Sequence, residues 1–171
     1  MKKYLNIFVA VLLSALTVSL ASCSKDDDEP DNGSSSSSSF TVNGEAYSIH
    51  KLSGANSTFT DYGSSLGSKI DAELYPAKSD ETDFYPRVQI SLDAPSGTLS
   101  KGQSLNITGG YVEMVTGMMQ GTTYKDIQGG KITVSEISSS TAVLNFENFK
   151  MANGSQTITL NGKLSFEYEK I

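Results

Sequence analysis

Residues that could support catalysis are scarce in this chain. The sequence contains one cysteine, Cys23, and one histidine, His50. A Ser-His-Asp or Cys-His arrangement would therefore have to use His50 as its base. His50 ends a segment that alternates like a strand and precedes Lys51, which is typical of a partly exposed residue near a loop. We expect it to have no catalytic or metal-binding role.

Pairs of acidic residues are the remaining candidates for hydrolysis. Asp71 and Glu73 are two positions apart in an alternating segment, as are Glu167 and Glu169, so each pair shares one face of a strand. A glycosidase needs two carboxyl groups across a cleft, about 5 to 9.5 Å apart. Coverage of a solvated strand face explains these pairs more simply. We predict that the protein is not an enzyme, and a carboxylate-dependent hydrolase is a second alternative.

Motifs for phosphate, metal and nucleophile sites are absent from the sequence. It contains no Walker loop, no Gly-x-Ser-x-Gly and no cluster with zinc-ligand spacing. The acidic segment 80–83 lacks the spaced ligands and the turn glycine of an EF-hand loop. We therefore expect no metal and no dissociable cofactor.

Aromatic side chains could bind a glycan by stacking on the faces of its sugars. The chain has no tryptophan, which is the side chain best suited to this role. Met114, Met118 and Met119 could line an adaptable apolar surface, although core filling or capping of a hairpin is the favoured interpretation. The candidate ligand-binding residues near predicted loops and strand ends, where a binding face would lie, are Tyr62, Tyr75, Tyr85, Tyr111 and Tyr124.

The elements that must position these side chains are β-strands. Residues 69–75 and 87–93 alternate between apolar and polar side chains, which predicts strands with one buried and one solvated face. Residues 40–42 and 45–49 flank Asn43-Gly44, the strongest short hairpin signal, because both turn positions need a positive φ. Residues 111–115 and 122–127 are predicted to form a second hairpin.

The C-terminal third predicts a three-stranded meander from residues 131–137, 141–151 and 156–171. In the last segment the apolar residues fall on even numbers, and this period of two excludes an amphipathic helix. Gly162 occupies an inward position and would permit a bend there. No helical period follows Phe40. The sequence therefore predicts an all-β domain, an antiparallel β-sandwich or a lipocalin-like barrel of roughly eight to ten strands.

The N-terminal residues have the layout of an export signal. Lys2 and Lys3 precede an uncharged apolar run that ends in small residues before Cys23. The run is at the lower length limit for a membrane span and contains polar residues, so a permanent transmembrane helix is the weaker interpretation. Leu20-Ala21-Ser22-Cys23 resembles the lipobox of bacterial lipoproteins. The resemblance implies that residues 1–22 are removed and that Cys23 carries a covalent lipid; a conventional secretory signal that leaves a free Cys23 is the alternative.

A short polar run directly follows Cys23. It resembles the export tag of Bacteroidetes surface lipoproteins, which implies attachment to the outer face of the outer membrane. A charge run that merely solvates the linker is the alternative interpretation. The residues of this proposed tag are Ser24, Lys25, Asp26, Asp27, Asp28 and Glu29.

Composition divides the rest of the chain into a tether and one domain. Residues 23–39 combine the acidic run with consecutive serines and have nothing apolar to bury, which predicts a disordered tether. Residues 40–171 have the length of a single β-rich domain. The formal net charge is −6 for the chain and becomes about −8 once Lys2 and Lys3 leave with the signal. Such a charge makes a nucleic acid an improbable partner.

Together these features predict a surface-anchored lipoprotein. The expected function is non-enzymatic binding of an extracellular glycan, a host molecule or a neighbouring envelope protein. A lipocalin-like carrier of a small apolar ligand is the first alternative, because alternating strands equally allow a closed barrel around a cavity. The sequence does not indicate an oligomeric state.

Overall fold

The computed structural model describes residues 40–49, 57–63, 66–80, 82–95 and 99–171. All of them belong to one compact unit, Ser36–Ile171. Cys23, the proposed export tag, the predicted tether and His50 lie outside the described residues. The described ranges contain strands and turns but no helix, and accordingly none long and apolar enough to cross a membrane.

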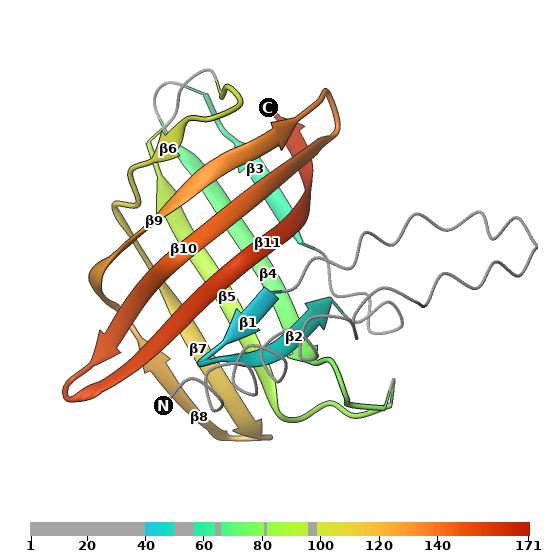
Figure 1. Cartoon of the computed structure of the whole chain (residues 1–171), viewed down its shortest axis with the longest axis vertical. Helices are drawn as coiled ribbons and strands as arrows, with labels where there is room; N and C mark the ends of the chain where they lie inside the picture. The colour runs from blue at the N-terminus through green and yellow to red at the C-terminus, as the bar shows by residue number, and fades with distance from the viewer. Residues whose placement is uncertain (1–39, 50–56, 64–65, 81, 96–98) are drawn as a thin grey trace, which may run out of the picture. The chain divides into compact units, whose positions relative to one another are not determined.

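The described residues form one sheet of eleven strands, which confirms the all-β prediction (Figure 1). This is one strand more than the predicted range, and three of the strands, β1, β3 and β6, have four residues or fewer. The strands are β1 (Phe40–Val42), β2 (Glu45–Ile49), β3 (Thr58–Asp61), β4 (Ser68–Pro76), β5 (Arg87–Ala94), β6 (Ser104–Leu105), β7 (Gly109–Gly117), β8 (Gln120–Tyr124), β9 (Asp126–Ile137), β10 (Thr141–Asn153) and β11 (Gln156–Lys170).

The sheet closes on itself between β4 and β11. At one end of these strands, β3 pairs with both of them; at the other end the β1–β2 hairpin bridges the same two strands. The result is a small closed barrel, and β5, β7 and β8 extend it beyond β4 while β10, β9 and β6 extend it beyond β11. In Figure 1, β9, β10 and β11 cross in front of β4, β5 and β7. The closure therefore places two layers of strands face to face.

The Asn43-Gly44 hairpin forms as the sequence predicts. Asn43 has a φ of 52° and Gly44 a φ of 84°, the left-handed conformations that this turn requires. β11 likewise follows its predicted alternation: Ile158, Leu160 and Phe166 are buried at even positions. Gly162 has a φ of 104° and lies opposite Phe146, at the point where the β10–β11 register shifts. The missing side chain allows the strand to bend there.

Three details of the sequence-based prediction are corrected. β3 was not predicted, and it pairs with β11 in parallel although the prediction was purely antiparallel. The arm predicted at 122–127 is divided at Lys125, whose backbone N–H donates to the Ala152 carbonyl over 3.0 Å, so β8 ends at Tyr124 and β9 begins at Asp126. The tip of the β7–β8 hairpin is shorter than predicted and consists of Met118 and Met119.

Inward-facing side chains fill the space between the two layers. Ile70, Leu74, Val112, Leu144 and Leu160 each have a relative exposure of 0%. Aromatic rings pack edge to face in this core: the ring centroids of Phe40 on β1 and Phe146 on β10 are 5.3 Å apart, and the ring centroid of Phe149, also on β10, lies 6.4 Å from that of Phe146. The core therefore consists of packed side chains around the closure of the barrel.

Candidate binding site

The outward face of β4, β5 and β7 carries a group of polar side chains and the ring of Tyr111. Antiparallel pairing places odd-numbered residues in rows across these strands. We call these residues the outward face. Its rows are Lys69, Asp93 and Gly109; then Asp71, Ser91 and Tyr111; then Glu73, Gln89 and Glu113.

A hollow of about 460 Å³ lies at the Lys69–Asp93 end of this face. Tyr62, which directly follows β3, lines the hollow and is 40% exposed, and Leu66 is 78% exposed. We call this depression the Tyr62 hollow. Its lining residues are Tyr62, Leu66, Gly67, Ser68, Lys69, Asp93, Ala94, Pro95 and Thr108. An exposed aromatic ring, an exposed aliphatic side chain and both signs of charge therefore meet in one depression.

Hydrogen bonds fix several polar groups in and next to the hollow. Ser91 Oγ donates to Asp71 Oδ1 over 2.7 Å, and Lys69 Nζ is 3.7 Å from the same oxygen. Thr108 donates to the Asp93 carbonyl through its backbone N–H, over 2.8 Å, and through its hydroxyl, over 3.3 Å. The exposed carboxylate of Asp93 forms no hydrogen bond or ion pair within the described part of the chain. It is therefore available to a ligand.

A second cluster lies at the other end of the outward face. Tyr75 donates its hydroxyl hydrogen bond to Glu73 Oε1, and Arg87 Nε is 3.4 Å from the same atom. That Arg87–Glu73 contact has ion-pair distance without hydrogen-bond alignment. The Arg87 guanidinium also lies 5.3 Å from the centre of the Tyr85 ring. The polar groups of this cluster contact one another. We therefore assign a structural role to this end of the outward face.

The five tyrosines suggested by the sequence have different environments. Tyr62 lines the hollow, Tyr111 lies on the outward face in the next row, and Tyr85 is held against Arg87. The structure corrects the expectation for the other two: Tyr75 is 1% exposed and Tyr124 is 9% exposed. Neither offers a free ring face to a ligand, because β4 and the end of β8 are packed at these positions.

The acidic pairs lie where the alternation predicts, each along one strand. Asp71 and Glu73 are half-buried on the outward face, whereas Glu167 and Glu169 are exposed on β11 next to β3. Within the described ranges no group of three His, Cys, Asp or Glu side chains could hold a metal ion.

Comparison with protein-family models, with curated proteins and with solved structures gives no match. The function of the outward face must therefore be inferred from its own geometry and chemistry. Asp93, Lys69, Leu66 and Thr108 were not among the sequence-based candidates. For Asp93 and Lys69 the signal was present, since both fall on the solvated positions of predicted strands.

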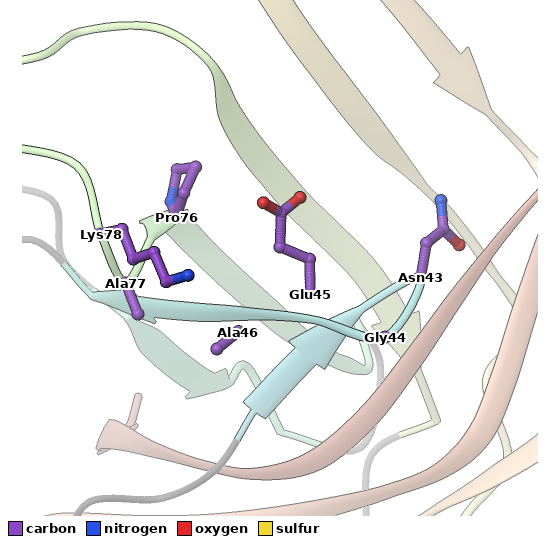
Figure 2. A pocket seen from close by; sticks show the side chains of 7 residues that line it. All are labelled: Asn43, Gly44, Glu45, Ala46, Pro76, Ala77 and Lys78. Carbon is purple, nitrogen blue, oxygen red and sulfur yellow. The ribbon is translucent and has the colours of Figure 1, made fainter.

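Two other hollows are less suited to recognition. Figure 2 shows the larger one, about 530 Å³, between the β1–β2 turn and the residues that follow β4. Glu45 and Lys78 project from its opposite walls, but its other lining residues are small or belong to the turn, and none is aromatic. The third, about 430 Å³, lies along β9 beside Ser104, Leu105, Asn106 and Ile107. Phe149 also lines the third hollow but is 2% exposed, so among these three hollows only the Tyr62 hollow has an exposed aromatic lining residue.

Proposed function

We propose that this protein is a lipid-anchored lipoprotein of the bacterial cell surface whose β domain binds a glycan in the Tyr62 hollow. The observation that carries the proposal is the meeting of the Tyr62 ring, the exposed Leu66 side chain and the unpaired Asp93 carboxylate in one depression. The lipobox, the acidic tag and the serine-rich tether of the sequence support the surface location. They would hold the domain outside the cell, where glycans are abundant.

The chemistry of the hollow fits a sugar ring. The C–H face of a sugar packs on an aromatic ring, and its hydroxyls hydrogen-bond to carboxylate and hydroxyl oxygens. Tyr111 lies on β7 two residues beyond Gly109, whose row ends in the hollow, so the two rows are about 7 Å apart. A glycan chain that extends from the hollow along these strands would therefore reach Tyr111.

Two features support surface binding over the alternatives. Many inward-facing residues, among them Ile70, Leu74 and Leu144, are fully buried, which favours a packed core over the lined cavity that a carrier of apolar ligands needs. Asp71 is engaged by Ser91 and Lys69, and Glu73 by Tyr75 and Arg87. No two carboxylates face each other across the Tyr62 hollow, as a glycosidase would require.

A glycan array probed with the full-length lipoprotein in detergent tests this function. Binding should weaken at least tenfold in Tyr62→Ala and to a smaller extent in Tyr111→Ala, because each substitution removes a stacking surface. Met119→Ala is the matched control: this side chain is 96% exposed at the β7–β8 tip, away from the hollow, and its loss should not change binding. The proposal fails if no glycan is retained, or if Tyr62→Ala binds as tightly as the parent protein.

Binding to a neighbouring envelope protein is a second candidate function. Phe84, Met118 and Met119 are 65%, 88% and 96% exposed. Arg87 pairs with Val115, so the segment with Phe84, which precedes β5, and Met118, which follows β7, lie at the same end of two adjacent strands. Exposed large apolar side chains at one end of a sheet suit a protein contact. A photo-crosslinking residue at Met118 should capture an envelope protein on intact cells, and the same residue at Lys163 on β11 should not.

A further inference from the structure

The unpaired carboxylate of Asp93 restricts which glycans can enter the Tyr62 hollow. Asp93 is exposed and lines the depression. An ionised carboxylate only accepts hydrogen bonds, so whatever group of the ligand meets Asp93 has to be a donor. The inference below rests on the glycan-binding function proposed above.

The other polar groups of the site add to this preference for donors. The Lys69 ammonium is already next to the Asp71 carboxylate, at 3.7 Å. Ser91 directs its hydroxyl hydrogen to Asp71, and Thr108 directs its own to the Asp93 carbonyl. The Ser91 and Thr108 hydroxyls therefore offer a ligand mainly lone pairs, whereas the Lys69 ammonium keeps its N–H donors beside Asp71. Among the described residues, Lys69 is the only cation that lines the hollow; it lies opposite Asp93 in the β4–β5 register but forms its ion pair with Asp71, so the Asp93 carboxylate remains without an ion pair.

The aromatic wall favours positive charge as well. A cation near the face of a tyrosine ring is attracted by the negative potential of the ring. Tyr62 and Asp93 both line the hollow, and their combination is the chemistry that recognises an ammonium group. We infer that the site selects glycans with free amino groups, and that it discriminates against glycans with carboxylates or sulfates. The net charge of −6 on the chain acts in the same direction.

A matched pair of oligosaccharides tests the inference. Chito-oligosaccharide and its fully de-N-acetylated form differ only in whether each nitrogen is an amide or an amine. The full-length lipoprotein, inserted into vesicles of zwitterionic lipid, should bind the de-N-acetylated form about tenfold more tightly. That preference should decrease as salt is added, because ions screen the attraction. An oligogalacturonate of equal length should bind most weakly of the three.

Substitutions identify the group responsible. Asp93→Asn keeps the shape of the side chain and should abolish the preference for the amine. Glu113→Gln is the control: it removes one acid from the outward face two rows away, about 13 Å along the strands, and should leave the preference intact. Tyr62→Ala should weaken binding of both oligosaccharides.

The possible failures are distinguishable. If the acetylated oligosaccharide or the oligogalacturonate binds at least as tightly, and Tyr62→Ala abolishes that binding, the proposed function stands and the amine preference is wrong. An amine preference that survives in Asp93→Asn also overturns the inference, since another group would then cause it. If none of the three oligosaccharides binds and the glycan array is empty, both proposals are wrong.

Discussion

Asn43 and Thr159 bind each other twice, although 116 positions separate them in the sequence. The Asn43 backbone N–H donates to the Thr159 carbonyl over 2.8 Å, and the Thr159 N–H donates to Asn43 Oδ1 over 2.8 Å. The turn between β1 and β2 is thereby fastened to β11 at the place where the barrel closes. A short local motif thus contributes directly to the tertiary closure.

Substitutions at Asn43 should separate its two roles. Asn43→Gly keeps the left-handed backbone and loses the side-chain acceptor, so the free energy of unfolding should fall by about 1 kcal/mol. Asn43→Ala loses the acceptor and also strains the backbone at a φ of 52°, which should add about another 1 kcal/mol. Urea denaturation of both variants measures the difference. Equal losses would show that the φ of this residue does not matter.

Gly110 should tolerate no side chain, because a Cβ there would lie 2.2 Å from the Ser91 carbonyl oxygen. Gly110→Ala should therefore destabilise the protein by several times more than Gly102→Ala. Both glycines have positive φ values, 107° and 85°, but nothing lies within 4 Å of a Cβ at Gly102. The unfolding temperature of Gly102→Ala reports the backbone strain alone, and that of Gly110→Ala reports the same strain together with the clash. Similar unfolding temperatures would contradict the tight approach of β7 to β5.

Tyr47 should make the protein lose stability in alkali. Burial raises the pKa of its hydroxyl above the ordinary value of 10.0, and the nearby negative charge of Glu45 raises it further. Above pH 10 the unfolded chain gives up this proton more readily than the folded chain, so stability is retained below pH 10 and falls as the pH rises past it. Denaturant midpoints on both sides of that pH should show a smaller loss for Tyr47→Phe. An unchanged loss would assign the alkaline sensitivity to other groups, such as Tyr168, whose pKa burial also raises.

Phe146 should be among the most costly side chains to remove. It is 1% exposed and contacts both Phe40 and Phe149, so Phe146→Ala leaves a cavity inside the core. We expect a loss of about 3 to 5 kcal/mol in the free energy of unfolding. Phe84→Ala, at a position that is 65% exposed, should change it by less than about 0.5 kcal/mol. A small effect at Phe146 would mean that the core can collapse around the gap.

Cys23 should control membrane attachment if the lipobox functions as proposed. The parent protein should partition into detergent and have the mass of the acylated chain without residues 1–22. Cys23→Ser should remove the lipid and release the protein from the membrane fraction, because each buried methylene of an acyl chain contributes about 0.8 kcal/mol to anchoring. An unmodified Cys23 in a soluble parent protein would contradict the proposal.

The amino-acid sequence alone determined the local features of this fold. The even-numbered apolar residues from Ile158 to Phe166 predict β11, and Asn43-Gly44 predicts its hairpin, because neighbouring residues encode both strand alternation and turn geometry. The same alternation correctly places Asp71 and Glu73 on one face of β4.

Only the tertiary structure decided how these strands meet. The parallel pairing of β3 with β11 joins segments more than a hundred residues apart, and no local pattern specifies such a partner. Burial of Tyr75 and Tyr124 likewise depends on what packs against them, which alternation near a strand end does not reveal. The Tyr62 hollow combines side chains from β4, β5 and the segments next to them, so it exists only once closure and register bring Tyr62 and Asp93 to the same depression.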